Sequence, residues 1–162
     1  MNTSAVIGIG SRVLNEGYGP GAWHGADLKA AIAAVTPALA FWRPAEGGHN
    51  IAEIALHHAY CARGVRAQIS GRPSEPFILP GEDWFEAADE RAISWEKIQA
   101  IVHTEQERLG ALVAEIEAGQ ATSPLADGGR FDLVLGITGH AIYHAGQIQL
   151  IKRLREGGEI SA

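Results

Sequence analysis

The spacing of apolar residues along the chain predicts helices rather than strands. Apolar residues recur three and four positions apart over long segments, and no alternating apolar and polar run is flanked by hairpin turns. A first helical region covers about residues 5–35, interrupted by the sequence YGPGAWHG at 18–25. Pro37 follows Thr36, which predicts a short helical turn in the sequence TPALAFW.

Three longer helices follow this region. Asn50 and Glu53 form a capping-box pattern, which marks the start of a second helix. Paired glycines at 157–158 are expected to end the last one. The three helices are expected over about residues 50–70, 94–118 and 130–156.

The segment between the second and third helices determines the expected topology. Its sequence, GRPSEPFILPGEDW, holds three prolines within eight residues and cannot be helical. A helix of about 20 residues is about 30 Å long, and a nearly extended connector of this size spans that length. The second and third helices are therefore expected to run parallel. The pattern predicts an all-α, up-down-down-up four-helix bundle in a single domain covering residues 1–162.

Composition and charge exclude several classes of protein. The net charge is −6 and the basic residues are scattered, which argues against nucleic-acid binding. Cys61 is the single cysteine, so an intrachain disulfide is excluded, and the first residues show no secretory signal. Residues 133–151 lack Asp, Glu, Lys and Arg, but their histidines and glutamines suit a buried bundle helix better than a membrane span. We expect a cytoplasmic protein without membrane contact.

Two histidines in the fourth helix are the first candidates for chemistry. His140 and His144 stand four residues apart, so they share one helix face and can bind one metal ion. The alternative is a structural or surface role. The apolar surroundings favour a metal, because two buried imidazoles each need a polar partner.

A third ligand has to come from another helix, and the second helix offers two adjacent histidines. His58 lies near the centre of the apolar stripe of that helix. His57 lies about 100° away, at the edge of the stripe. Periodicity alone therefore favours His58 as the inward residue. Of the remaining histidines, His103 is expected on the surface, His49 in a loop, and His24 in a local hydrogen bond.

Two longer motifs carry a resemblance to a known family. The sequence GGHNIAEIALHHAY at 47–60, followed by GHAIYHAGQIQLIKR at 139–153, resembles the DinB-like family of bacterial proteins, described as metal-dependent hydrolases. The resemblance covers nearly the whole chain and implies a four-helix bundle with a long connection between helices two and three. It also implies a metal site of three histidines, which by motif position are His57, His140 and His144. The motif thus favours His57 and periodicity favours His58.

Two polar residues are candidates for orienting the ligands. Glu53, one turn before His57, either only closes the capping box or also orients the His57 ring. Gln147 is a similar candidate for His144, since metal-bound imidazoles usually donate their second N–H to an oxygen.

Three neutral nitrogens suit zinc, nickel or iron, and an open coordination position is typical of a catalytic site. The resemblance implies a metal-dependent hydrolase or thiol-S-transferase that acts on a small-molecule substrate, the latter with a low-molecular-weight thiol cosubstrate. Bundles of this kind often form homodimers. The alternative function is a non-enzymatic metal- or ligand-binding bundle. The sequence identifies no catalytic residue.

Overall fold

The computed structural model describes residues 8–44 and 47–159, and within these ranges it contains helices and no strand. The all-α class predicted from the sequence is therefore confirmed. Residues 5–7, the start of the first predicted helical region, lie outside the described residues. The helices are α1 (Ile9–Tyr18), α2 (Leu28–Ala33), α3 (Pro37–Ala40), α4 (Ile51–Ser70), α5 (Trp95–Glu117) and α6 (Asp127–Glu159).

The predicted starts of α4 and α5 are confirmed by their caps, whereas α6 begins at Asp127, earlier than the predicted start near residue 130. In the capping box of α4, the Asn50 side chain accepts a hydrogen bond from the Glu53 backbone N–H at 2.9 Å, and the Glu53 carboxylate accepts one from the Asn50 N–H at 3.3 Å. At α5, the Ser94 hydroxyl accepts from the Lys97 N–H at 3.2 Å. These side chains satisfy N–H groups that have no partner within the helix.

The predicted end of the last helix is wrong. We expected Gly157 and Gly158 to end it, but α6 continues to Glu159. Glycine ends a helix when it adopts the left-handed conformation, as Gly71 does after α4 with φ 69°. Gly157 instead lies inside the helix, where glycine only weakens it.

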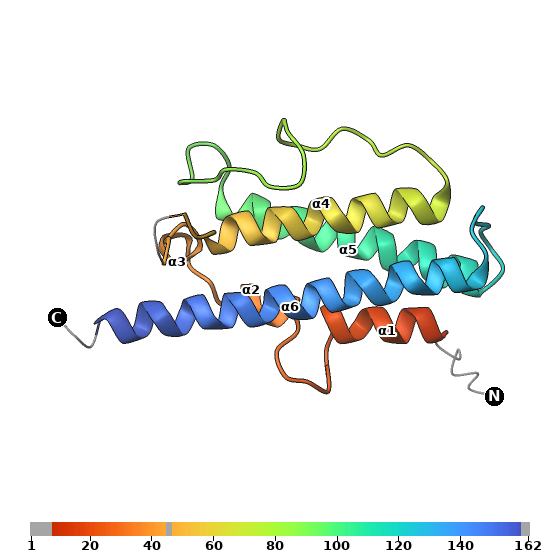
Figure 1. The fold of residues 1–162 in the computed structure, drawn as a ribbon, viewed down its shortest axis with the longest axis horizontal. Coiled ribbons are helices and arrows are strands. Elements are labelled where there is room, and N and C mark those ends of the chain that lie inside the picture. Colours follow the sequence, from red (N-terminus) through yellow and green to blue (C-terminus); the bar gives the residue numbers. More distant parts are fainter. Residues whose placement is uncertain (1–7, 45–46, 160–162) are drawn as a thin grey trace.

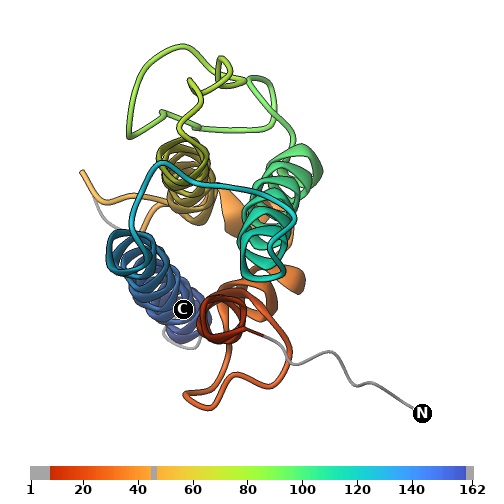
Figure 2. The ribbon, with the colours of Figure 1, turned by 90° about the vertical axis from the view of Figure 1, so that its right-hand side faces the viewer.

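The long helices pack side by side around a common axis (Figure 2). α6 contacts α4 on one side and both α1 and α2 on the other, and α5 contacts α4 and α1. In Figure 1, α4 and α5 run in the same direction, whereas α1 and α6 run in the opposite one. Residues 71–94, the crossover segment, return along the outside of the bundle from the end of α4 to the start of α5.

The crossover segment is attached to the start of α4 by buried contacts. Phe85 and Ala87 are buried in the main hydrophobic core. The Asn50 side-chain amide donates to the Ala87 carbonyl at 2.7 Å, and the Ala87 N–H donates to Glu53 at 3.2 Å. The residues that begin α4 thereby also fix how the crossover lies over that helix.

None of the helices in the described ranges is long and apolar enough to cross a membrane. This includes α6, whose central stretch without Asp, Glu, Lys or Arg was the segment of the sequence that had to be checked as a membrane span. Its buried polar residues Thr138 and His144 face the bundle interior.

Candidate metal centre

The imidazole rings of His57, His140 and His144 meet between α4 and α6. The Nε2 atom of His140 lies 3.0 Å from Nε2 of His57 and 3.1 Å from Nε2 of His144. The three residues form a group whose ligand atoms all lie within 4.8 Å of one another. The structure thus brings the predicted pair on α6 together with the histidine that the motif indicated on α4.

The spacing of these nitrogens fits a divalent metal ion. Zinc–nitrogen bonds of about 2.0–2.1 Å at tetrahedral angles place two ligand nitrogens about 3.3 Å apart, and right angles place them about 3 Å apart. The observed separations of 3.0 and 3.1 Å fall in this range. The three histidines could therefore hold a metal ion with little rearrangement.

The crossover segment holds the His57 ring in place. Nδ1 of His57 donates to the Asp83 carbonyl at 2.9 Å and lies 3.1 Å from the Asp83 carboxylate. The Trp84 ring stacks on His57 with centroids 4.0 Å apart and planes 7° apart. Asp83 has φ 65°, a left-handed conformation that is uncommon for aspartate. No local sequence signal marked Asp83 or Trp84, because their positions depend on how the crossover packs.

Glu53 does not orient His57, so only its capping-box interpretation is confirmed. Its carboxylate binds the Arg43 guanidinium at 2.5 Å and accepts hydrogen bonds from the Asn50 and Ala87 N–H groups. Burial acts to raise the pKa of Glu53, but these hydrogen bonds, led by the one from Arg43, outweigh it and lower the pKa. Glu53 influences the cluster indirectly, through the position of the crossover segment and through His49, whose Nδ1 lies 3.2 Å from the Glu53 carboxylate.

Gln147 has the orienting position predicted for it. Its Oε1 accepts a hydrogen bond from Nδ1 of His144 at 2.6 Å. Its amide nitrogen donates to the Tyr143 hydroxyl at 3.1 Å, which fixes the amide orientation. With a proton on Nδ1, the Nε2 atom of His144 presents its lone pair to the cluster.

His58 is completely buried, as periodicity predicted. It does not join the three histidines of the cluster but contacts the outer nitrogen of one of them. Its Nδ1 lies 3.1 Å from Nδ1 of His140, and its Nε2 lies 3.3 Å from Oε1 of Gln106. Because the Gln106 oxygen only accepts, Nε2 of His58 donates, and its Nδ1 accepts the Nδ1 proton of His140. This chain leaves the Nε2 lone pair of His140 directed at His57 and His144.

Burial favours the neutral form of His58, His140 and His144, and an imidazole must be neutral to bind a metal. Burial, with a smaller effect of the neighbouring His144, lowers the pKa of His140 to about 4. Burial also lowers the pKa of His144. For the fully enclosed His58, burial and then His140 lower the pKa to about 3.

Cys61 lies beside the cluster. Its sulfur is 3.9 Å from both ring nitrogens of His57, and it forms a second group of ligand atoms with His57 and Asp83. Burial, followed by the Asp83 carboxylate, raises the pKa of Cys61 to about 11. A raised pKa favours the protonated thiol, whereas the thiolate is the form that binds metals and attacks substrates.

The other histidines lie where the sequence placed them. His24 makes the expected local hydrogen bond, with Nε2 2.7 Å from the Glu16 carbonyl. His103 is partly exposed beside Glu107. His49 precedes α4 and also stacks on the outer face of Trp84, with centroids 3.7 Å apart, so Trp84 is held between two imidazoles.

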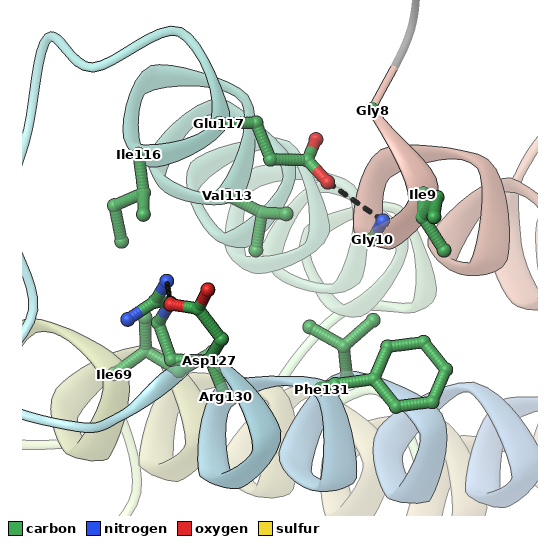
Figure 3. Close-up of a pocket in the computed structure, with 11 residues that line it drawn as sticks. Gly8, Ile9, Gly10, Ile69, Val113, Ile116, Glu117, Asp127, Arg130 and Phe131 are labelled. Carbon is green, nitrogen blue, oxygen red and sulfur yellow. Dashed lines mark hydrogen bonds and ion pairs between the residues drawn. The ribbon is translucent and has the colours of Figure 1, made fainter.

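A cavity of about 670 Å³ lies away from the cluster, near the starts of α1 and α6 and the end of α5 (Figure 3). Its polar groups bind one another. The Glu117 carboxylate accepts from the Gly10 N–H at 2.6 Å, and Arg130 binds Asp127 at 2.5 Å. The rest of the lining is largely apolar, including Phe131, so this cavity does not offer a converging set of ligands.

The structure therefore defines an all-α bundle with a three-histidine cluster between two of its helices. The family model described as the DinB superfamily matches residues 22–148, more than three quarters of the chain, and the chain belongs to this superfamily. The matched range includes α4, α5 and all three histidines of the cluster. Comparisons with curated proteins and with solved structures gave no match.

Proposed function

We propose that His57, His140 and His144 bind one divalent ion of zinc, nickel or iron through their Nε2 atoms. The observation that carries this proposal is the arrangement of both nitrogens of each ring. The three Nδ1 atoms are engaged by Asp83, His58 and Gln147, and the three Nε2 atoms converge. Orientation of ligand imidazoles by hydrogen bonds to the second nitrogen is usual for protein metal sites.

We further propose a metal-dependent enzyme of the thiol-S-transferase or hydrolase kind that acts on a small molecule. A divalent ion held by three nitrogens, with a position open, supplies Lewis acidity toward an oxygen or sulfur donor. The chain adds polar groups at the edge of the cluster. The Asp83 carboxylate is 63% exposed and the Tyr143 residue is also 63% exposed, so both can contact a substrate.

A non-enzymatic metal- or ligand-binding bundle is the second candidate. The observation that favours it is that the carboxylates near the cluster already have partners, so none of them stands free to act as a general base. Glu53 binds Arg43, and the Asp83 carboxylate lies 3.1 Å from the proton-bearing nitrogen of His57. A general base needs a free lone pair within reach of the substrate proton.

Metal content tests the first proposal. Protein purified without chelator and without an affinity-tag metal should contain about one ion per chain. The His144→Ala variant should contain almost none, and the His103→Ala variant should match the wild type. An unchanged metal content in His144→Ala would contradict the three-histidine site.

Chelation tests whether the ion serves function rather than folding. A chain of 162 residues buries enough apolar surface to fold without metal. The chelated protein should keep its helical circular dichroism and a cooperative melt. Its stability should fall only by the linkage contribution, about 2.7 kcal/mol at a free metal concentration of 100 times Kd. A chelated protein that is unfolded at room temperature would contradict this.

Activity separates the two candidate functions. A screen of small thiols with electrophilic and ester substrates should give turnover that is lost on chelation and restored by metal. Stoichiometric metal without turnover in any substrate class would support the binding bundle instead.

A further inference from the structure

A second cavity, of about 870 Å³, lies at the end of α4. Its wall is formed by the last turns of α4, the second half of α5, the start of the crossover segment and the turn after α5. The end of α4 and that turn lie at the same end of the bundle (Figure 1). Arg66 in this wall is nine residues beyond His57, which is about 14 Å along α4 and on the opposite side of the helix. The cavity is therefore separate from the metal centre.

Three arginines line this cavity, which we call the arginine cavity. Arg66 comes from α4, Arg72 from the crossover segment and Arg108 from α5. Arg72 and Arg108 are exposed and Arg66 is half-buried, so their guanidinium groups are within reach of a molecule from solution. Positive groups from three different elements thus meet around one cavity.

The Glu75 carboxylate faces these guanidinium groups from the edge of the cavity, but at long distances. It is 66% exposed, and its Oε2 atom lies 3.5 Å from Nη1 of Arg108 and 3.8 Å from Nη2 of Arg66. It also lies 3.8 Å from Nη2 of the buried Arg63. A charge-assisted hydrogen bond between such groups is about 2.7–2.9 Å long. Glu75 therefore attracts three arginines without binding any of them closely, and exposed ion pairs of this kind contribute little to stability.

The charges around the cavity do not cancel. The buried Glu105 lies 3.4 Å from Arg66 and 3.5 Å from Arg108, which are again long distances for an ion pair. Glu115 lines the cavity as an exposed residue. The arginines in and behind the wall are Arg63, Arg66, Arg72 and Arg108, and the glutamates are Glu75, Glu105 and Glu115. Four arginines and three glutamates leave one positive charge here, in a chain whose net charge is −6.

Two of the arginines also have donors that the chain does not use. The Nε atoms of Arg63 and Arg66 are buried and have no hydrogen-bond partner among the residues that the structure describes. Buried donors without a partner are rare in folded proteins because they are destabilising. Arg63 is nevertheless held in place, since its Nη2 donates to the Pro76 carbonyl at 2.8 Å. The chain thus positions these guanidinium groups without saturating them with acceptors.

We propose that the arginine cavity binds a small-molecule oxyanion, a phosphate or carboxylate group, in the position that the Glu75 carboxylate occupies loosely. Guanidinium groups bind both kinds of oxyanion through paired N–H donors. Glu75 lies on a stretch of the crossover segment without regular secondary structure, so its side chain can turn outward while the helices stay in place. The bound oxyanion would make the close hydrogen bonds to Arg66, Arg72 and Arg108 that Glu75 does not make.

The rest of the lining indicates that the oxyanion belongs to an organic molecule. Hydroxyl groups of Ser74 and Thr122 line the cavity together with the apolar side chains of Ala111 and Leu112. Cavities of about 300–1,000 Å³ are usual for small-molecule ligands. The proposed ligand is therefore an organic phosphate or carboxylate, and free anions serve as probes of its charged group.

Isothermal titration calorimetry with inorganic phosphate and, separately, with succinate tests the site. The wild type should bind at least one of these anions saturably, with a Kd of about 1 mM or lower. The anion that binds more tightly identifies the charged group of the ligand. Arg108→Gln should weaken this binding by about 10-fold, because it removes a charged donor pair. Arg12→Gln, at an exposed arginine on α1, is the matched control and should bind like the wild type. Circular dichroism should show unchanged helicity in both variants.

A gain of affinity gives the sharper test. Glu75→Gln should bind the anion about 10-fold more tightly, because it removes a like charge from the position of the ligand. Glu86→Gln, at an exposed glutamate of the crossover segment outside the cavity, should leave the affinity unchanged. His144→Ala should also bind the anion like the wild type, so this result does not depend on the metal centre. The inference is overturned if the wild type binds neither anion, if Arg108→Gln binds as well as the wild type, if Glu75→Gln binds more weakly, or if His144→Ala loses binding.

Discussion

The histidine cluster and the cavity near the start of α6 both lie between α6 and its neighbours, but their polar groups are arranged in opposite ways. In the cluster, outer partners engage every Nδ1 atom, and Nε2 of His140 lies close to Nε2 of His57 and of His144. In the cavity, Glu117 and Arg130 are bound to partners in the wall. The cavity has volume and the cluster has convergent lone pairs, and only convergent lone pairs define a metal site.

The sharpest test of this comparison separates the two adjacent histidines of α4. His57→Ala should abolish metal binding, because it removes a ligand. His58→Ala should keep close to one ion per chain but lower the free energy of unfolding by about 2–4 kcal/mol, because it leaves a cavity in the core and unpaired groups on His140 and Gln106. Elemental analysis and chemical denaturation of both variants measure the two effects.

The opposite result has a clear meaning. Loss of metal in His58→Ala, with retention in His57→Ala, would move the site toward the bundle centre. Periodicity would then be the better guide to the ligand than the motif.

A second prediction concerns the residue that fixes the crossover segment over the cluster. Glu53→Gln should lower the free energy of unfolding at neutral pH by about 2–4 kcal/mol, because it leaves Arg43 without its buried carboxylate partner. It should also weaken metal binding by less than His57→Ala does, since Glu53 is not one of the three histidine ligands and acts on the cluster through its neighbours.

The pH dependence of stability identifies the Glu53 charge as the cause. The pKa of Glu53 is lower in the folded protein than its ordinary value, so the folded state favours the carboxylate. Its contribution is therefore fully present above the unfolded-state pKa and is lost as the pH falls through the folded-state pKa. The difference between wild type and Glu53→Gln should shrink in acid. If the stability difference between wild type and Glu53→Gln stayed constant from neutral to acidic pH, the shape of the side chain and not its charge would account for the loss of stability.

The sequence predicted those parts of the molecule that depend on local patterns. The Asn50–Glu53 capping box, the single-face spacing of His140 and His144, and the proline-rich crossover are visible in short stretches. The burial of His58 followed from helical periodicity. These features need no knowledge of how the helices are arranged.

The features that the sequence did not predict depend on tertiary packing. Asp83 and Trp84 reach His57 because buried contacts between the start of α4 and Ala87 set the position of the crossover. Gln106 engages His58 across the bundle from α5. Periodicity places a side chain inside or outside but cannot state which ring nitrogen meets which partner, so the role of His58 was not predictable.

A third prediction addresses the outer partners of the cluster. Gln147→Leu should lower metal affinity by about 10–100-fold, because the His144 ring loses the acceptor that orients it. Metal should still bind at saturation, since all three ligands remain. Competition with a metal indicator gives the affinity, and Gln68→Leu, at an exposed position on α4, is the matched control. Equal affinities in the two variants would mean that the hydrogen bond at 2.6 Å does not orient the ligand.

The smallest predicted effect lies at the cavity. The Glu117 carboxylate caps the start of α1 by accepting from the Gly10 N–H at 2.6 Å and from the Ser11 hydroxyl at 2.5 Å. Glu117→Ala should lower the free energy of unfolding by about 1 kcal/mol, as expected for loss of a helix cap and of a negative charge at a helix N-terminus. Added salt should reduce this difference, because the interaction is exposed and therefore screened.

The control for this prediction is Glu115→Ala, at an exposed glutamate two residues away, which should change stability less. Metal affinity should equal that of the wild type in both variants, since the partners of Glu117 lie at the start of α1 and not among the histidines. A tenfold loss of affinity in Glu117→Ala alone would couple the cavity to the cluster and remove the distinction between them.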